Sequence, residues 1–230
     1  MYLCLSLGFE LGAQPLYLAH VNRSSLKVML NGWADGGESE NTGHAPQILV
    51  RDGEVEVVIG QLVGFNILLA DGGLDFMSVA GGIYPRAAMG SDGTKLVIYM
   101  DRNGSLHLNE IVEGSLRDRA LVGKVAIKTS SEGQLPWDMA IDGAGTAHLL
   151  VEDDTQGPDA LLYQTVDATD HVSAPVFVTS ELVSDLPGMQ HYALETDLCH
   201  RPTVVAITQS NNQEQTGASM LPVLKILEVR

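Results

Sequence analysis

Cysteine is nearly absent from this 230-residue sequence, which contains only Cys4 and Cys199. Two cysteines cannot form a disulfide framework, and neither stands in the C-x-x-C spacing that zinc sites commonly use. The two residues lie near opposite ends of the chain. We therefore expect either two buried thiols or a single bridge that ties the chain ends together.

Basic residues are also scarce, because 13 lysines and arginines stand against 29 aspartates and glutamates, for a formal net charge of −16. A surface of this sign repels nucleic-acid phosphates and anionic lipid headgroups. The charge balance therefore argues against a nucleic-acid partner and a membrane-surface role. Two interpretations of the acidic surface stay open: a solvated face suited to solubility, or a patch that recruits a cationic partner or a metal.

Long hydrophobic runs are missing as well. No stretch approaches the roughly 18 apolar residues of a membrane-spanning helix, so we expect no membrane insertion. The N-terminal segment MYLCLSLGFELGAQPL lacks the basic start of a secretion signal, and its apolar residues alternate with others. The sequence thus predicts no targeting segment, and it leaves the compartment and the oligomeric state undetermined.

Alternation of apolar residues with others is the pattern that the sequence does show. The first strand-like stretch places these side chains on one face: Leu3, Leu5, Leu7, Phe9 and Leu11. A period of two residues is typical of half-buried β-strands, and no segment combines a 3.6-residue stripe with helix-capping residues. With 45% hydrophobic residues the chain can bury a sizeable core. We therefore predict an all-β fold.

One segment of the chain recurs. The stretch Pro85–Val112 returns as Pro136–Val166, with equivalent positions 52 residues apart at first and 54 apart at the end. The matched pairs include Ala87 with Met139, Gly93 with Gly145, Asp101 with Asp153 and Leu108 with Leu162. In each copy we expect four strands, several of them joined by turns that contain Asp or Asn with Gly.

Four-stranded units that repeat at a period of about 50 residues predict radial stacking, because each small sheet must bury both faces against neighbours. Strand counting gives about four and a half units. We therefore predict a single domain over residues 1–230, a β-propeller with five four-stranded blades. The last unit lacks a fourth strand, which we expect the N-terminal strand Tyr2–Leu11 to supply, thereby closing the ring.

The blade pattern consists of a short first strand, a D-G or D-x-x-G turn, and an apolar second strand that ends near an acidic residue. It resembles the sialidase-like propellers that contain bacterial neuraminidase repeats, best over Pro85–Thr208. The Asp-box of that family, S/T-x-D-x-G-x-T-W, is incomplete in Ser91–Thr94, which reads SDGT. The Arg-Ile-Pro motif of sialidases is absent, and Tyr84–Arg86 reads YPR. The resemblance therefore implies a blade style and a propeller fold.

Sialidase chemistry does not follow from this resemblance. A sialidase needs three arginines that converge on the substrate carboxylate, because paired N–H groups match a carboxylate in geometry and charge. Only Arg86 and Arg201 stand near the expected starts of first strands. The sequence therefore does not predict a sialidase.

Propeller glycosidases of the arabinanase and xylosidase kind are a second enzymatic possibility. They place three carboxylates on the first, innermost strands of their blades. Asp138 and Glu195 are the candidates here, and Glu54 or Glu56 would join them if their hairpin were innermost. Two carboxyl groups about 6–9 Å apart could perform inverting hydrolysis. The alternative is that these carboxylates are only solvated at the mouth of the channel.

Metal and cofactor motifs are not found. The seven histidines form neither HExxH nor a His-x-His pair, and the acidic Glu152–Asp154 lacks the spacing of an EF-hand loop. The chain also has no phosphate-binding P-loop, dinucleotide fingerprint or nucleophile elbow. The sequence thus predicts no metal site and no cofactor, and we expect His148 to be a satisfied core histidine.

Aromatic residues amount to only 5% of the chain, which argues against a lectin with one aromatic platform per blade. Trp33 lies in an expected loop, Asn31–Gly36, and is the better ligand candidate. Trp137 directly precedes a first strand, where it can pack between blades or bind a ligand, and Arg86 is a third candidate. We predict a non-catalytic module that recognises a carbohydrate or protein partner on one propeller face. The alternative is a glycoside hydrolase.

Overall fold

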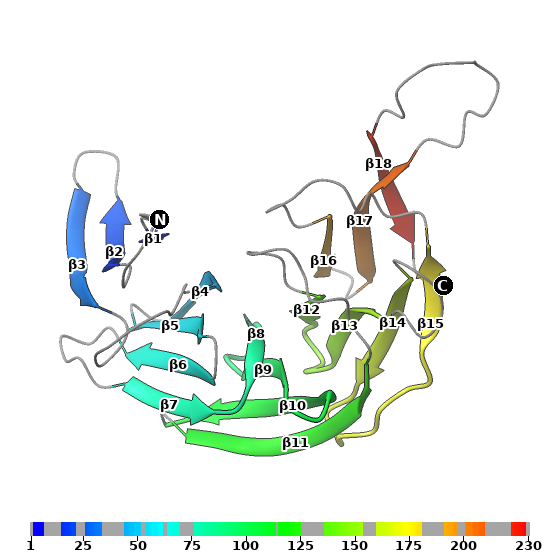
Figure 1. Ribbon diagram of the computed structural model, residues 1–230, viewed down its shortest axis with the longest axis horizontal. Helices are drawn as coiled ribbons and strands as arrows, with labels where there is room; N and C mark the ends of the chain where they lie inside the picture. Colours follow the sequence, from blue (N-terminus) through cyan, green and yellow to red (C-terminus); the bar gives the residue numbers. More distant parts are fainter. Residues whose placement is uncertain are drawn as a thin grey trace. The chain divides into compact units, whose positions relative to one another are not determined.

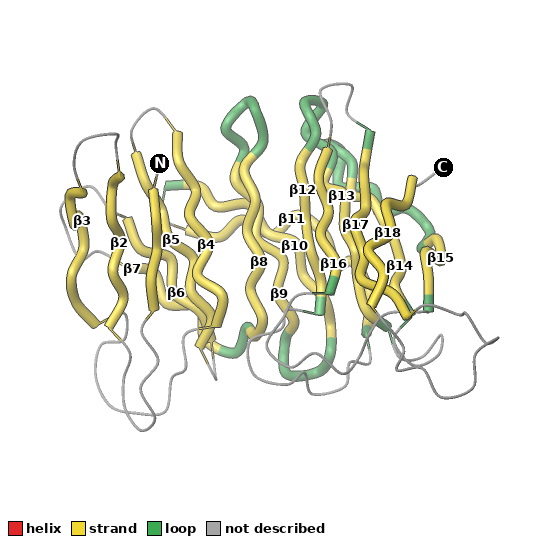
Figure 2. The backbone as a smooth tube through the Cα atoms, turned by 90° about the horizontal axis from the view of Figure 1, so that it is seen from above, coloured by secondary structure: helices red, strands yellow, loops and turns green. Residues whose placement is uncertain are grey.

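The computed structural model shows an all-β protein. It describes residues 2–6, 15–21, 26–33, 44–51, 54–61, 64–69, 76–113, 115–125, 136–153, 160–180, 191–196, 201–209 and 222–228. Every regular element in these ranges is a β-strand, and Figure 2 shows strands and loops along the coloured backbone. Within the same ranges no helix has the length and apolar character needed to cross a membrane.

Three antiparallel sheets follow one another along the first half of the chain, each built from strands that are consecutive in sequence (Figure 1). Sheet 1 contains β1 (Tyr2–Ser6), β2 (Pro15–Val21) and β3 (Leu26–Trp33). Sheet 2 contains β4 (His44–Arg51), β5 (Glu54–Gln61), β6 (Gly64–Leu69) and β7 (Phe76–Ala80). Sheet 3 contains β8 (Ile83–Met89), β9 (Lys95–Met100), β10 (Ser105–Val112) and β11 (Ser115–Lys124).

Two further antiparallel sheets follow in the second half of the chain. Sheet 4 contains β12 (Trp137–Ile141), β13 (Ala147–Glu152), β14 (Leu161–Val166) and β15 (Val176–Thr179). Sheet 5 contains β16 (Tyr192–Thr196), β17 (Pro202–Gln209) and β18 (Pro222–Glu228). The recurring segment of the sequence corresponds to sheets 3 and 4, and the bounds of β9 and β13 differ by the same 52 residues at both ends.

The chain divides into two compact units. The first comprises Met1–Met89 and Gly93–Leu121, and it contains sheets 1 and 2 with most of sheet 3. The second comprises Gly90–Asp92 and Val122–Arg230, and it contains sheets 4 and 5.

Sheets 2 and 3 bury one hydrophobic core between them in the first unit. Its fully or nearly buried members are Leu49, Val58, Ile67, Ala87, Val97 and Ile111. Each comes from a different strand: β4, β5 and β6 of sheet 2, and β8, β9 and β10 of sheet 3. Burial of one such aliphatic side chain stabilises the folded chain by about 1.5–3 kcal/mol relative to an exposed one.

Sheets 4 and 5 bury a second core in the second unit. Its members are Ala140, Leu150, Leu161, Tyr163, Tyr192, Leu194, Val204 and Ala206. The first strands of the two sheets, β12 and β16, contact each other directly. All five residues of β12 are buried, so this strand is covered on both faces.

Some details differ from the sequence predictions. The N-terminal strand β1 pairs with β2 in sheet 1, and among the described strands sheet 5 contains only β16, β17 and β18, so β1 does not complete it as predicted. Strand β11 begins at Ser115 and not at Leu121, because the charged residues Arg117 and Asp118 face solvent and hide the apolar alternation. The expected loop at 34–43 and the cysteine pair lie outside the described side chains.

Candidate functional site

The carboxylate of Asp138 is held by backbone groups of two sheets. Its Oδ1 accepts a hydrogen bond from the N–H of Met139 at 2.8 Å, and Oδ2 accepts one from the N–H of Leu194 at 2.9 Å. The residue is 4% exposed. Asp138 therefore fastens β12 of sheet 4 to β16 of sheet 5, across 56 residues of sequence.

Gln47 makes the corresponding contact in the first unit. It lies opposite Val58 on the neighbouring strand, as Asp138 lies opposite Leu150. Its Oε1 accepts the N–H of Ala87, and its Nε2 donates to the carbonyl of Pro85 at 2.9 Å. The same place on a first strand thus carries a polar side chain that binds the backbone of the next sheet's first strand.

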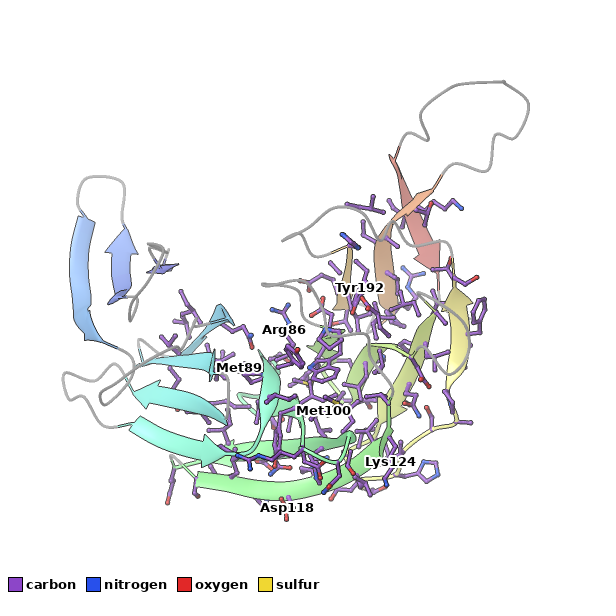
Figure 3. The ribbon with its side chains drawn as sticks, in the orientation of Figure 1. Arg86, Met89, Met100, Asp118, Lys124 and Tyr192 are labelled. Carbon is purple, nitrogen blue, oxygen red and sulfur yellow. The ribbon has the colours of Figure 1, made fainter. Side chains whose placement is uncertain are left out.

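Glu195, the second predicted catalytic acid, lies directly after Leu194 on β16 and is exposed. Because side chains alternate along a strand, Glu195 points to the face opposite Leu194 and Tyr192, which are buried in the core (Figure 3 labels Tyr192). The structure thus brings the carboxylate of Asp138 to the backbone beside Glu195. One carboxylate is buried and hydrogen-bonded to N–H groups, and the other faces solvent.

The other predicted residues lie in different settings. Trp137 is 0% exposed, so its indole belongs to the packed interior. Arg86 is half-buried on β8, opposite Ile98 (Figure 3). Trp33 was expected in a loop, but it is the last residue of β3, where it pairs with Pro15; its side chain is outside the described part of the structure.

Glu56 is not on an innermost hairpin position. It lies on β5, the second strand of sheet 2, and its Oε1 accepts a hydrogen bond from Lys95 Nζ at 2.5 Å. The pair links sheets 2 and 3 inside the first unit. Glu56 therefore contributes to sheet packing there.

Two hairpins share a motif that the sequence prediction missed, D-x-x-G-[S/T]-x-H. In sheet 3 it begins at Asp101 and ends at His107; in sheet 4 it begins at Asp142 and ends at His148. The aspartate Oδ1 accepts the N–H groups of the second and fourth following residues, at 2.8–2.9 Å in both hairpins. A single carboxylate oxygen thus holds the turn.

Glycine at the fourth position of the motif is required by the backbone. Gly104 and Gly145 have φ angles of 77° and 78°, a region that residues with a side chain rarely adopt. In each turn the glycine N–H donates to the carbonyl of the aspartate at 3.1 Å. The motif therefore specifies a tight turn from local sequence alone.

The histidine at the seventh position extends the motif in the buried copy. His148 Nε2 lies 3.3 Å from Asp142 Oδ2, and His148 Nδ1 lies 2.5 Å from the Tyr163 hydroxyl. Burial, followed by the charge of Asp142, raises the pKa of Tyr163 to about 12. Burial also works to raise the pKa of Asp142, but the N–H of Thr146 and the His148 ring outweigh it and lower that pKa. The network is a closed, buried chain of hydrogen bonds.

The copy in sheet 3 is half exposed. His107 Nε2 lies 3.2 Å from Asp101 Oδ2, and the side chains are 31% and 30% exposed. The N–H of Ser105 makes the largest contribution to a lowered pKa of Asp101, about 2, and His107 adds to it. The His107 ring stacks on Tyr99 with centroids 5.4 Å apart.

The sequence did contain a signal for these pairs, namely an Asp and a His six residues apart that recur after 41 residues. This offset is not the 52-residue period, because the motif joins the second and third strands of sheet 3 but the first and second of sheet 4. The motif therefore does not follow the blade repeat, and the repeat alone does not reveal it. Among the described residues, no group of three or more His, Cys, Asp and Glu side chains is placed to hold a metal ion.

Comparison with known proteins identifies the fold only. No protein-family model matches the chain, and no curated protein matches its sequence. Among solved structures, AofleA from Arthrobotrys oligospora matches at 8% identity and a TM-score of 0.56, over 94% of this chain and 66% of that one.

Two other solved structures match at a similar level. The BP39L lectin from Burkholderia pseudomallei matches at 16% identity and a TM-score of 0.51, over 90% of this chain and 63% of that one. The GH93 α-L-arabinofuranosidase of Fusarium graminearum, in complex with arabinobiose, matches at 15% identity and a TM-score of 0.50, over 80% and 61%. The chain thus spans less than two thirds, or about two thirds, of these proteins, and the likeness indicates an all-β fold of the propeller type.

Proposed function

We propose that this chain is a non-catalytic recognition module that binds a carbohydrate. The closed, single-domain propeller of five blades predicted from the sequence belongs to the same proposal. Two similar structures support the ligand class, since one is a lectin and the other holds arabinobiose. Trp33 and Arg86 remain the proposed ligand contacts in the first unit. Trp137 is better suited to packing, because its side chain is fully buried.

The observation that carries the non-catalytic part of the proposal is the setting of Asp138. Both of its carboxylate oxygens accept backbone N–H groups, and the residue is 4% exposed. A general acid or base must reach a proton of the substrate within hydrogen-bond distance. A carboxylate that fastens two strands serves the fold, and its motion toward a substrate would break the contact between β12 and β16.

The alternative is a glycoside hydrolase in which Asp138 and Glu195 act as the acids. One observation favours this alternative. The hydrogen bond from the Leu194 N–H to Asp138 brings Asp138 next to β16, the strand that carries Glu195. Inverting hydrolysis, however, needs two carboxyl groups that face each other across a substrate and a water molecule. Both oxygens of Asp138 accept backbone N–H groups and the residue is 4% exposed, so this carboxylate is poorly placed to reach a substrate.

A combined binding and turnover experiment separates the two functions. Wild type, Glu195→Gln and Asp138→Asn are screened on a glycan array and on a panel of glycosidase substrates. We expect glycan binding without turnover in wild type, and unchanged binding in Glu195→Gln, whose side chain is exposed. Asp138→Asn should lower the thermal midpoint, since the amide has a single acceptor oxygen and one of the two backbone N–H groups is left facing an NH2 donor.

Two results would overturn the proposal. Hydrolysis by wild type that disappears in Glu195→Gln would establish the hydrolase. If wild type showed neither glycan binding nor turnover, a carbohydrate ligand would be ruled out. A protein partner, sought by pull-down, would then be the ligand to pursue.

A further inference from the structure

A group of aromatic and polar side chains covers one face of sheet 3 near the turn between β9 and β10. We call it the Tyr99 cluster; its members are Tyr99, Asp101, His107, Asn109 and Asp118. Tyr99 lies directly opposite His107, and their rings stack at an interplanar angle of 15°. Asn109 Nδ2 donates to Asp118 Oδ1 at 2.9 Å and reaches the Tyr99 hydroxyl at 3.5 Å. Figure 3 labels Asp118 on the outer strand β11.

The cluster has a buried base and an exposed rim. Asn109 is only 3% exposed, whereas His107 and Asp101 keep about a third of their side-chain surface and Asp118 is exposed. Burial, followed by the charge of Asp118, raises the pKa of Tyr99, so its hydroxyl stays a proton donor at neutral pH. The cluster thus combines a buried amide with half-exposed rings, a half-exposed carboxylate and an exposed one, so several hydrogen-bonding atoms lie together at the surface of sheet 3.

Two acceptors on the rim have no partner within the described residues. Asp101 is ionised at neutral pH, because its pKa is about 2, so the Nε2 of His107 carries the proton and donates to it. In the tautomer that carries its proton on Nε2, Nδ1 is an acceptor, and the described part of the chain offers it no hydrogen bond. The same holds for Oδ2 of Asp118, whose Oδ1 accepts from Asn109.

The buried hairpin provides an internal comparison. There, the corresponding histidine, His148, uses both ring nitrogens, on Asp142 and Tyr163. The turn itself needs only the aspartate Oδ1 and the glycine. The unused acceptors of the sheet 3 copy are therefore not required by the hairpin.

We propose that the Tyr99 cluster binds a neutral saccharide, whose hydroxyls donate to His107 Nδ1 and Asp118 Oδ2 while its apolar face packs on the ring edge. His107 and Asn109 are two residues apart, so they point to the same face of β10, and Asn109 binds Asp118; the two acceptors therefore lie on one face of the sheet. Two carboxylates, Asp101 and Asp118, repel an acidic sugar. The inference rests on the proposed carbohydrate function and adds a binding site to the ligand contacts proposed above, Trp33 and Arg86.

The test begins with a glycan array that carries neutral oligosaccharides, arabinobiose among them, and sialylated glycans. The best neutral ligand is then titrated by calorimetry against wild type, His107→Phe, Asp118→Asn and the control His171→Phe. His107→Phe keeps a flat ring but removes the acceptor. Asp118→Asn changes an exposed side chain, so folding should be retained. His171 is an exposed histidine in the turn that Asp167 holds, in the second unit of the chain.

We expect each cluster variant to lose about tenfold or more in affinity, the effect of one hydrogen bond to a charged or polar acceptor. The control should bind like wild type, and neutral glycans should bind at least about tenfold better than sialylated ones. Circular dichroism and the thermal midpoint confirm that the variants are folded.

Each contrary result has a distinct meaning. Neutral glycan binding that survives both cluster variants overturns this site and leaves the carbohydrate function standing. A preference for sialylated glycans overturns the neutral class. Wild type that binds no glycan overturns the proposed function, and the site falls with it.

Discussion

Two hairpins with the same sequence motif differ in almost everything beyond the turn. In both, the aspartate accepts two backbone N–H groups and faces a histidine six residues later. The pair in sheet 4, Asp142 with His148, is 10% and 8% exposed, whereas the pair in sheet 3, Asp101 with His107, is 30% and 31% exposed. Local spacing therefore determines the turn, and packing determines what the pair does.

The contribution of a hydrogen-bond network to stability therefore depends on how far the network is buried. A buried polar group that loses its partner pays the full cost of desolvation, while an exposed one turns to water. In the network of sheet 4, both ring nitrogens of His148 have a partner, Asp142 on one side and the Tyr163 hydroxyl on the other. The network in sheet 3 ends in acceptors that face outward.

Replacement of the aspartate in each turn should give the largest difference in stability between the two hairpins. Asp142→Ala removes the acceptor for the N–H groups of Ala144 and Thr146 and leaves His148 without its carboxylate. We expect a loss of about 3 kcal/mol in the free energy of unfolding, measured by urea denaturation.

The matched control for that experiment is Asp101→Ala. It removes the same set of local bonds at the half-exposed site, where water replaces them. Its loss should be clearly smaller. Equal losses in the two variants would mean that the turn alone, and not its burial, accounts for the stability.

Lowering the pH should have a smaller effect on stability, through the carboxylate of Asp101. The pKa of Asp101 is about 2 in the folded chain and 3.8 when unperturbed, so its carboxylate stabilises the folded state at pH values above about 4. This contribution is lost as the pH falls from about 4 toward 2. The thermal midpoint of wild type should therefore approach that of Asp101→Asn over this interval. A gap between the two proteins that stays constant from pH 5 to 2 would contradict the assignment.

A substitution in a third turn should change the stability least. Asp167 holds it with the same pair of N–H bonds, to Thr169 and His171, but Asp170 stands where the other turns have glycine and has a φ of 66°. Asp170→Gly should stabilise the protein by about 0.5 kcal/mol, because glycine adopts this conformation at little cost. Differential scanning calorimetry measures the shift. A lower thermal midpoint would show that the Asp170 side chain contributes more than its backbone costs.

Much of the fold could be predicted from the sequence, because strand alternation and Gly-containing turns are local. The repeated segment correctly located β9 and β13, and the D-x-x-G turn was expected at the hairpins. The start of β11 was missed, since an outer strand with charged residues such as Arg117 shows little apolar alternation. The strand position of Trp33 was missed because its Asn-Gly neighbourhood is also typical of a loop.

The site was less predictable for a physical reason. The partner of Asp138 is a backbone N–H 56 residues away, and no local pattern encodes such a contact. From the sequence, Asp138 and Glu195 are equivalent carboxylates on first strands. Only the packing of β16 against β12 makes one of them a buried acceptor and leaves the other in solvent.

The contact between Asp138 and Leu194 also makes one amide a reporter. Backbone amides in a sheet usually exchange their hydrogens with solvent when their own ladder frays. The Leu194 N–H, in contrast, is covered by a side chain of another sheet, so its exchange requires sheets 4 and 5 to separate. Its exchange rate therefore measures how often the second unit opens along this seam, a quantity that the stability of either sheet alone would not reveal.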